Sequence, residues 1–516
     1  MNEAAPARPR WAAPLIVAVL LGGLYVVIAP HTADLAAQTA RAHVFRRSGY
    51  VPYWTGWYGG TPMAGYSLIT PPLLGLFGPI WLGALTIVAS ALVAAPLLAS
   101  CRRPRAAAIA VVVSGTFDVF SGRTTFAAGV VVALIAMLAV ERRRNKRAFL
   151  GGLLAAATSP VAGVLLVIVG VATVLAGPRR RAAGFAAVVG VGVAMGVIAF
   201  LASGSRGGYE PFTRTSLLLS IGTTLVVMLS PVGRRLRVVG WLTLWLLVLC
   251  FFIHSPIGAN ATRIAVLGAA PALVAAARWP KLVLAPAVIV ASLLSIGQLV
   301  NDMSASGGAV ASHRFVVPLK NELLAQSDIF QYRVEVVAPK THWPLTYLLP
   351  EVAVARGWER QTDEARNRMF YGRAPLTAAA YRAFLDQNAV GYVALPFHSA
   401  LDYGSVGEGA LIVDGLPYLH QIWSNPNWRL YAVVKPAPIV ERLAEPSPVP
   451  TALVLAADDT GFTFDTYSGG RYLVRMTWSP YLVTSGGHVG RAPHNHVWVT
   501  VPAAGHYRLR AVWRWP

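Results

Sequence analysis

The sequence predicts an α-helical polytopic membrane bundle of about eleven spans, followed by an α/β domain and a small C-terminal β domain. Three observations lead to this prediction. The 516 residues are 55% hydrophobic and only 13% charged, with a mean hydropathy of +0.54, which is too apolar for an ordinary soluble protein of this length. Basic clusters separate the apolar runs of the first 300 residues. From Asn301 onward the pattern becomes that of a water-soluble domain.

Apolar runs occupy most of the first 300 residues. A helix needs about 20 apolar residues to cross the bilayer, and shorter or broken helices are tolerated inside a bundle. The tripeptide Thr-Ser-Pro at 158–160 breaks the stretch 148–177, so we expect this stretch to cross and return. The candidate spans are 11–30, 72–99, 105–120, 124–140, 148–158, 161–177, 182–202, 215–232, 238–254, 262–277 and 282–299.

The charge distribution predicts the orientation. Before Asn301 the chain has 25 Lys and Arg residues against 5 Asp and Glu residues, and from Asn301 onward it has 19 against 17. Basic loops stay in the cytoplasm, which puts the N-terminus inside and the segment after Leu299 outside. We therefore expect a multi-pass protein of the cytoplasmic membrane, with no nucleic-acid partner despite the net charge of +22. The clusters are Arg8 and Arg10; Arg102, Arg103 and Arg105; Arg142 to Arg144, Lys146 and Arg147; Arg179 to Arg181; Arg234, Arg235 and Arg237; Arg278 and Lys281.

The predicted domains are a transmembrane domain at 1–300, an extracytoplasmic α/β domain at 301–436 and an extracytoplasmic β domain at 447–516. The first apolar run resembles a signal peptide in its basic start, but its length favours a retained anchor. In the second domain, a helical pattern at 376–388 alternates with short apolar strands at 391–396 and 429–434. A Pro-rich linker precedes the last domain, where RYLVRMTW and HVWVTV alternate with period two.

The first outer loop, 30–72, carries the leading catalytic candidate. Asp34 is one of few acids in the membrane half, and ionisable groups near hydrocarbon are costly to keep. Its carboxylate is suited to act as a general base towards an acceptor hydroxyl. A surface amphipathic helix that merely meets water is the alternative. Four polar residues are spaced i, i+3, i+7 and i+10, which on a helix places them on one side: His31, Asp34, Gln38 and Arg41. His31, Gln38 and Arg41 are therefore substrate-binding candidates beside Asp34.

Asp118 is the second catalytic candidate, at the predicted outer end of the third span. With Asp34 it would suit Mg²⁺ or Mn²⁺, because these ions prefer oxygen ligands. A local ion pair with Arg123, itself a substrate-binding candidate, is an equally good explanation.

Two further residues flank the outer loop HSPIGANATR. Arg263 is well placed to hold a lipid phosphate, and His254 is the second candidate for that contact. Snorkelling to lipid headgroups is the alternative for the arginine.

Aromatic residues crowd the first loop. Most such residues are interfacial anchors, but one or two can stack on a sugar ring, with Trp54 and Trp57 as candidates. In the last domain, His494 and His496 are two apart on an expected strand, which makes a poor metal site without further ligands.

The segments HTADLAAQ and GYVPYWTGWYGGTPMAGY before a proline-led second span resemble bacterial GT-C membrane glycosyltransferases. The segments RVEVV, YVALP and NPNWRLYAVV are similar to membrane proteins labelled as 6-pyruvoyl-tetrahydropterin-synthase-related, a label that implies no pterin chemistry here. The resemblance implies that Asp34 serves the acceptor or a metal, that Asp118 is the second acid, and that Arg263 holds the phosphate of a polyprenyl-phosphate donor. The paired Asp-x-Asp of the family is absent from the first loop.

The sequence therefore predicts a glycosyltransferase that moves a sugar from a polyprenyl-phosphate-linked donor to an extracytoplasmic cell-envelope glycan or lipid. The alternative is a non-catalytic, membrane-anchored protein whose outer domains bind a glycan or a partner. A lipid or sugar transporter is a third possibility, but polar residues at mid-bilayer are scarce.

Overall fold

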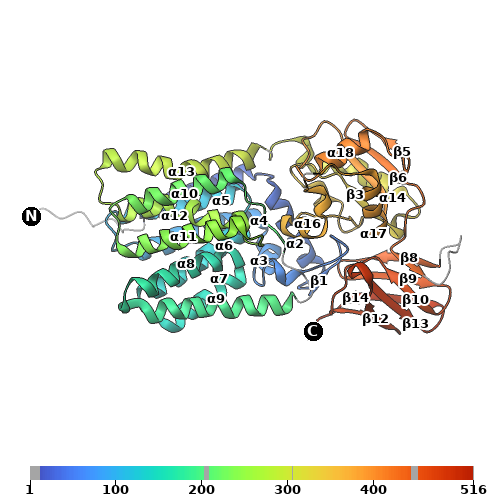
Figure 1. Cartoon of the computed structure of the whole chain (residues 1–516), viewed down its shortest axis with the longest axis horizontal. Helices are drawn as coiled ribbons and strands as arrows, with labels where there is room; N and C mark the ends of the chain where they lie inside the picture. Colours follow the sequence, from blue (N-terminus) through green and yellow to red (C-terminus); the bar gives the residue numbers. More distant parts are fainter. Residues whose placement is uncertain (1–11, 203–207, 305, 373, 443–450, 515–516) are drawn as a thin grey trace, which may run out of the picture. The chain divides into compact units, whose positions relative to one another are not determined.

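The computed structural model describes residues 12–202, 208–304, 306–372, 374–442 and 451–514 (Figure 1). Arg8, Arg10 and the second half of the predicted Pro-rich linker lie outside these residues. Contacts divide the chain into two compact units, each described by itself. Unit 1 comprises Met1–Gln38, Tyr66–Ala199 and Tyr209–Ser304, and unit 2 comprises Thr39–Gly65, Phe200–Gly208 and Ala305–Pro516.

Unit 1 is helical, and helices occupy all eleven ranges that the sequence predicted as spans. The second range is divided at Gly78, whose φ of 76° ends one helix before Pro79 begins the next. The helices are α1 (Ala12–Ile28), the start of α2 (Ala33–Ser48), α3 (Thr70–Phe77), α4 (Pro79–Leu97), α5 (Pro104–Phe120), α6 (Thr124–Glu141), α7 (Asn145–Thr158), α8 (Pro160–Ala176), α9 (Arg181–Leu201), α10 (Arg214–Leu229), α11 (Arg234–Phe252), α12 (Arg263–Ala276) and α13 (Lys281–Ser304).

Six helices of the described residues are long and apolar enough to cross a membrane, or seven if α1 and α2, bent by 82°, form one span. The shorter apolar helices α8 and α10 fall below that length. The number of eleven spans therefore stays a prediction.

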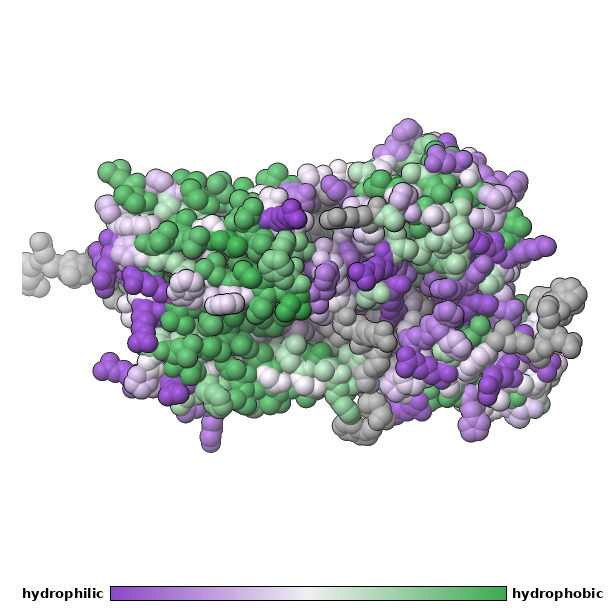
Figure 2. All heavy atoms as spheres, viewed as in Figure 1, coloured by the Kyte–Doolittle hydropathy of each residue, from purple (hydrophilic) through white to green (hydrophobic). Residues whose placement is uncertain are grey.

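Large apolar side chains cover the outside of these helices. Figure 2 shows a mainly hydrophobic surface over the helical region of unit 1. A soluble protein rarely exposes so large a contiguous apolar surface, whereas lipid favours it. The chain is thus a membrane protein with apolar helices. Examples of these exposed residues are Leu20, Leu76, Trp81, Phe185, Leu218, Trp245 and Leu282.

Unit 2 contains a four-stranded mixed sheet in the order β3-β4-β6-β5. β3 and β4 are parallel, and the remaining pairs are antiparallel. The predicted helix at 376–388 and the strands at 391–396 and 429–434 correspond to α17, β4 and β6. The elements are β3 (Arg333–Val336), β4 (Val390–Pro396), β5 (Leu419–Ser424), β6 (Trp428–Val433), α14 (His313–Ala325), α15 (Pro344–Tyr347), α16 (Arg360–Arg366), α17 (Ala378–Gln387) and α18 (Val406–Val413).

The end of unit 2 forms two antiparallel four-stranded sheets, β12-β13-β10-β7 and β11-β14-β9-β8. Alternating inward residues such as Phe464, Tyr472 and Val499 build their shared core. β7 joins the first sheet, so this part begins before the predicted boundary at residue 447. The strands are β7 (Val440–Arg442), β8 (Ala452–Ala457), β9 (Gly461–Thr466), β10 (Gly470–Val474), β11 (Leu482–Thr484), β12 (His488–Arg491), β13 (Val497–Val501) and β14 (Gly505–Ala511).

Most of the first loop belongs to unit 2 rather than to the helical unit. It forms the small hairpin β1 (Tyr53–Trp54) and β2 (Thr61–Pro62). The Tyr53 hydroxyl donates to the carbonyl of Thr477 at 2.6 Å, and the Trp57 indole donates to the carbonyl of Leu345 at 3.3 Å. Burial raises the pKa of the Tyr53 hydroxyl, which is further evidence that the loop is an internal part of this unit.

Candidate functional site

Three aspartates from distant segments of unit 1 surround one arginine. Arg123, immediately before α6, lies with Nε 3.3 Å from Asp34 Oδ2 and Nη1 3.5 Å from Asp118 Oδ1. Its Nη2 is 3.0 Å from Asp302 Oδ2. A guanidinium group offers five donors in a fixed plane, which allows it to serve several carboxylates at once. Both catalytic candidates of the sequence therefore meet at Arg123.

Gly122 in the turn between α5 and α6 makes this meeting possible. Its φ is +85°, and a Cβ there would lie 2.1 Å from Thr32 Oγ1 and 2.9 Å from the backbone nitrogen of Leu35. Only glycine fits a left-handed turn packed this closely against another backbone. The turn therefore reaches the start of α2, where Asp34 lies in the first turn.

Gln38, on α2, also fixes the contact between α2 and the turn at Gly122. Its amide group donates to the carbonyl of Gly122, and its Oε1 accepts from the backbone nitrogen of Thr125 at 2.7 Å and from the Thr125 hydroxyl at 3.0 Å. The side chain is buried. Gln38 thus holds α2 against the start of α6, and this structure adds no support for its predicted contact with substrate.

Arg263, at the start of α12, is the second cation of the site. Its Nε donates to Asn260 Oδ1 at 2.8 Å, its Nη1 lies 3.6 Å from Asp118 Oδ1, and its guanidinium lies 4.4 Å from the centre of the Phe126 ring. Asp118 Oδ2 and Arg263 Nη1 are buried without a hydrogen-bond partner among the described residues. A buried polar atom without a partner is costly, so both atoms are available to a ligand.

Both residues line an apolar cavity of about 440 Å³. The cavity follows α6 from Ala127 to Glu141, a separation of 14 residues (141 minus 127), or about 20 Å at the helical rise. Asp118 and Arg263 lie towards one end, and the Glu141–Arg235 ion pair lies towards the other. The space is suited to an amphiphile with a polar head and a long apolar tail. Its remaining walls are mainly apolar side chains of α4, α5, α8, α10, α11 and α12.

The three carboxylates differ in their access to water. The side chain of Asp34 is 41% exposed, that of Asp302 is 23% exposed, and that of Asp118 is 3% exposed. Asp34 is therefore open to a reactant from solution, whereas Asp118 opens only towards the cavity. Asp302 is not among the residues predicted from the sequence, because the predicted span ends at residue 299 whereas α13 continues to Ser304.

The charges of this cluster limit its chemistry. If all groups are ionised, three carboxylates face two guanidinium groups, which leaves one negative charge (−3 + 2 = −1). No group of three or more His, Cys, Asp or Glu side chains among the described residues is arranged to hold a metal ion. Arg123 already contacts both Asp34 and Asp118, so these residues do not fit the predicted Mg²⁺ or Mn²⁺ site.

The two predicted histidines, His31 and His254, are both exposed. His31 is exposed and precedes α2, which begins at Ala33, so it is not on the predicted helix face. His254 is exposed with its ring 4.5 Å from that of Tyr209. Neither histidine contacts Arg123 or Arg263 through any of the interactions described above.

The remaining three candidates belong to unit 2. Arg41 is buried and pairs with Glu359 at 2.7 Å. Trp54 and Trp57 are fully buried, with ring centres 4.7 Å apart, and offer no open face in this structure. Their substrate-binding roles stay predictions, and their present contacts are those of packing residues.

No protein-family model matches the chain, and no curated protein matches its sequence. Among solved structures, it is similar to arabinosyltransferase EmbB from Mycobacterium smegmatis, with a TM-score of 0.37 and 12% sequence identity. The similarity covers 100% of this chain but only 64% of that protein's chain, less than two thirds of its length. The relation in fold is distant, and a similarity at this level carries no argument about activity.

Proposed function

We propose that the protein is a membrane glycosyltransferase that moves a sugar from a polyprenyl-phosphate-linked donor to a cell-envelope glycan or lipid on the extracytoplasmic side. The observation that carries the proposal is the position of Asp118 and Arg263 at the polar end of an apolar cavity, with Asp34 joined to Asp118 through Arg123. A lipid-linked sugar phosphate has the matching shape, because its charged head joins a long hydrocarbon tail.

The donor is held at both of its ends. Arg263 Nη1, which lacks a hydrogen-bond partner within the described chain, donates to the donor phosphate, and the tail lies along α6. The phosphate departs as an anion, so a preorganised guanidinium stabilises the charge that develops in the transition state.

Asp34 acts on the acceptor. It is the most exposed of the three aspartates, and Arg123 fixes its carboxylate at 3.3 Å. As a general base it takes the proton of the acceptor hydroxyl while the sugar–phosphate bond breaks, a contribution of roughly 10²- to 10⁴-fold in rate. Asp118 and Asp302 hold Arg123 in position for this step.

The charges at the ends of four helices support an extracytoplasmic location of the three aspartates. α5 and α13 begin in basic clusters and finish near the aspartates, whereas α6 and α12 begin beside them and finish in basic clusters. Basic loops are retained in the cytoplasm. The directions of these four helices therefore support the proposal that the aspartates lie at the outer surface of the cytoplasmic membrane.

Replacing Asp34 by Asn tests the base. We expect at least a 100-fold loss of label transfer from the lipid fraction to the glycan fraction of isolated membranes. The thermal unfolding midpoint should change little, because Asp34 is partly exposed. Asp386→Asn is the matched control, since Asp386 also pairs with an arginine, Arg382, at 2.9 Å in unit 2. Undiminished transfer by Asp34→Asn would remove Asp34 from the mechanism.

Filling the cavity tests the place of the donor tail. Gly115 and Gly268 line the cavity, and a Cβ at either position meets nothing within 4 Å. Gly115→Leu and Gly268→Leu should therefore fold and raise the KM for the donor at least tenfold. Gly196→Leu on α9 is the control, because Gly196 has the same open space but does not line the cavity. Equal kinetics in all three variants would place the tail elsewhere.

One observation favours a second function, a non-catalytic envelope protein that anchors a glycan-binding or partner-binding unit. That function requires Asp34 to pair with an arginine, and it does pair with Arg123. Mass spectrometry of envelope glycans and glycolipids with and without the intact gene separates the two. Suppose that a sugar is missing from the envelope without the intact gene and that the gene with Asp34→Asn does not restore it: this result supports glycosyl transfer. An unchanged glycan profile without the gene supports the non-catalytic anchoring function.

A further inference from the structure

Two loops of unit 2 meet at the carboxyl edge of its parallel strands. The loop after β3 and the loop after β4 are joined by Lys340 N to Ala400 O at 2.9 Å and by Asp402 N to Ala338 O at 2.9 Å. In open α/β sheets, ligands bind outside the carboxyl ends of the strands. The side chains on these loops are therefore the first place to seek a binding site in this unit.

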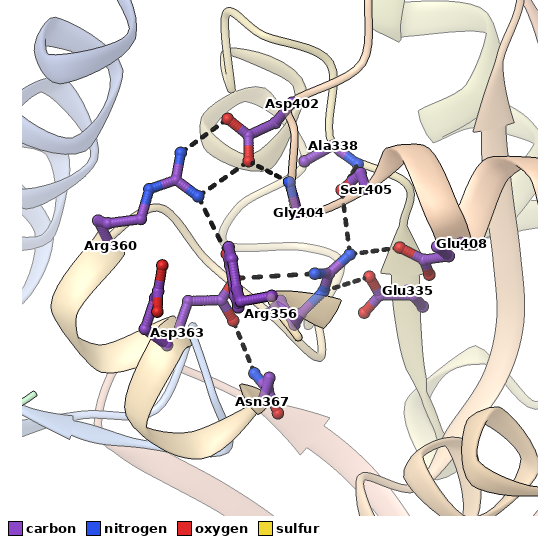
Figure 3. Close-up of polar contacts among 12 residues, drawn as sticks. Glu335, Ala338, Arg356, Arg360, Asp363, Asn367, Asp402, Gly404, Ser405 and Glu408 are labelled. Carbon is purple, nitrogen blue, oxygen red and sulfur yellow. Dashed lines mark hydrogen bonds and ion pairs between the residues drawn. The ribbon is translucent and has the colours of Figure 1, made fainter. Parts of the chain in front are cut away.

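Four planar groups are stacked at this edge. The His342 ring lies 3.5 Å from the Trp358 ring at an angle of 11°. The Arg360 guanidinium lies 4.7 Å from the Trp358 ring centre and 4.3 Å from that of Tyr403. Figure 3 shows how Asp402 fixes Arg360 through two hydrogen bonds of 2.7 and 2.9 Å. The four groups therefore follow one another from the buried His342 to the exposed Tyr403, in the order His342, Trp358, Arg360 and Tyr403.

Tyr403 presents an open, fixed aromatic face. Its inner face is covered by Arg360, yet the residue is 54% exposed, so the exposed part is mainly the outer face. The Tyr371 ring lies against the Tyr403 ring at 5.5 Å and 71°, and the Tyr403 hydroxyl donates to Glu364 Oε1 at 2.9 Å. Three contacts thus hold the ring in one orientation before any ligand arrives, which lowers the entropy cost of binding.

The surrounding charges select the ligand. The Arg360 cation behind the ring opposes a second cation on the outer face, because like charges so close repel. Tyr371, whose ring lies against Tyr403, donates its backbone N–H to the carbonyl of Arg368 at 3.1 Å, and Arg368 is exposed. Its guanidinium is a donor for hydroxyl or carboxylate oxygens. A sugar ring meets these conditions, because it stacks on an aromatic face and carries many acceptor oxygens.

We propose that the outer face of Tyr403, with Arg368 beside it, is a saccharide-binding site on unit 2. The site uses no residue of the Arg123 cluster and does not depend on glycosyl transfer. It supplies the glycan contact under either function proposed above. Its existence is therefore tested separately from catalysis.

The test is a binding experiment on the labelled full chain in a detergent without a sugar headgroup. The protein is applied to an array of neutral and acidic bacterial and plant oligosaccharides, and the strongest oligosaccharide is then titrated. We expect Tyr403→Ala to weaken binding by roughly tenfold or more, since a stacked ring contributes on that order. Tyr403→Phe keeps the ring and should bind within about threefold of the wild type.

Tyr467→Ala is the matched control, because Tyr467 is also exposed, at 61%, but has no ring contact among the described interactions. It should bind as the wild type does. The array contains no lipid-linked donor, so a failure of catalysis does not imitate a failure of this site. Absence of binding to every oligosaccharide would overturn the proposal. Equal losses in Tyr403→Ala and Tyr467→Ala, or displacement of the saccharide by tetramethylammonium, would also overturn it.

Discussion

Each unit contains an arginine surrounded by three carboxylates, yet the two clusters differ in what they leave open. In unit 2, Arg356 contacts Glu335 at 2.7 Å, Asp363 at 3.7 Å and Glu408 (Figure 3). All four side chains are buried, and the Phe370 ring covers the guanidinium at 4.0 Å. In unit 1, Arg123 contacts its three aspartates, of which Asp34 and Asp302 are partly exposed.

The comparison distinguishes a closed ion cluster, which only stabilises the fold, from an ion cluster that is open to a ligand. Around Arg356, Tyr381 and Ser405 also make hydrogen bonds to the charged groups, and neither described pocket includes the cluster. Around Arg123, the neighbouring Asp118 and Arg263 have atoms without a hydrogen bond and line a cavity, whereas Glu335, which also has such an atom, lines neither described pocket. The same motif of charges therefore stabilises the fold where it is closed and remains available to a ligand where it is open.

The largest effect is expected from Arg356→Met. Without the guanidinium, the negative charge that the carboxyl cluster of Glu335, Asp363 and Glu408 carries stays buried without a counter-charge, and breaking a buried ion pair in this way costs about 3–5 kcal/mol. We expect unit 2 to lose about that much free energy of unfolding, measured by denaturant titration of the purified protein. Arg508→Met, in an exposed pair with Asp458, is the control and should cost no more than about 1 kcal/mol. Equal losses of free energy of unfolding in the two variants would mean that the buried Arg356 cluster does not stabilise the fold more than an exposed ion pair does.

A smaller loss of stability is expected from Arg123→Met. Asp34 and Asp302 reach water when their partner is removed, so we expect about 1–3 kcal/mol, the cost of leaving mainly Asp118 unpaired. Label transfer should nevertheless disappear under the proposed function. A stability loss as large as that of Arg356→Met, without any effect on transfer or donor binding, would show that the unit 1 cluster is also a closed support.

The smallest effect is expected from Glu335→Gln, and it depends on pH. Burial raises the pKa of both Glu335 and Glu408, although Arg356 opposes the shift. Above the ordinary glutamate range near 4.3, the folded state keeps a proton that the unfolded state has lost, so stability falls as the pH rises. Glutamine imitates the protonated acid and removes this dependence.

The variant should therefore gain stability relative to the wild type between pH 5 and pH 8, by about 1 kcal/mol for each unit of pKa shift. Parallel unfolding profiles for both proteins across that range would contradict a protonated carboxyl beside Arg356. Thermal unfolding of the two purified proteins in matched buffers measures the difference.

The helices and the two catalytic candidates followed from local features of the sequence. Apolar runs and Pro or Gly breaks predicted the helices, because those signals depend on neighbouring residues. The scarcity of acids drew attention to Asp34 and Asp118. Asp302 was missed because it lies 179 residues from Arg123 in the sequence, and no local pattern records such a pair.

The sequence by itself determined that the chain is apolar, where its helices lie and which rare charged residues deserve attention, since composition and periodicity act within each segment. Tertiary structure alone decided which charges meet. It placed Gly122 against Leu35, joined Asp34 to Arg123, and put Arg41 in unit 2 beside Glu359. The physical reason is that ion pairs and cavities form between segments far apart in the chain, so packing rather than local preference selects the partners.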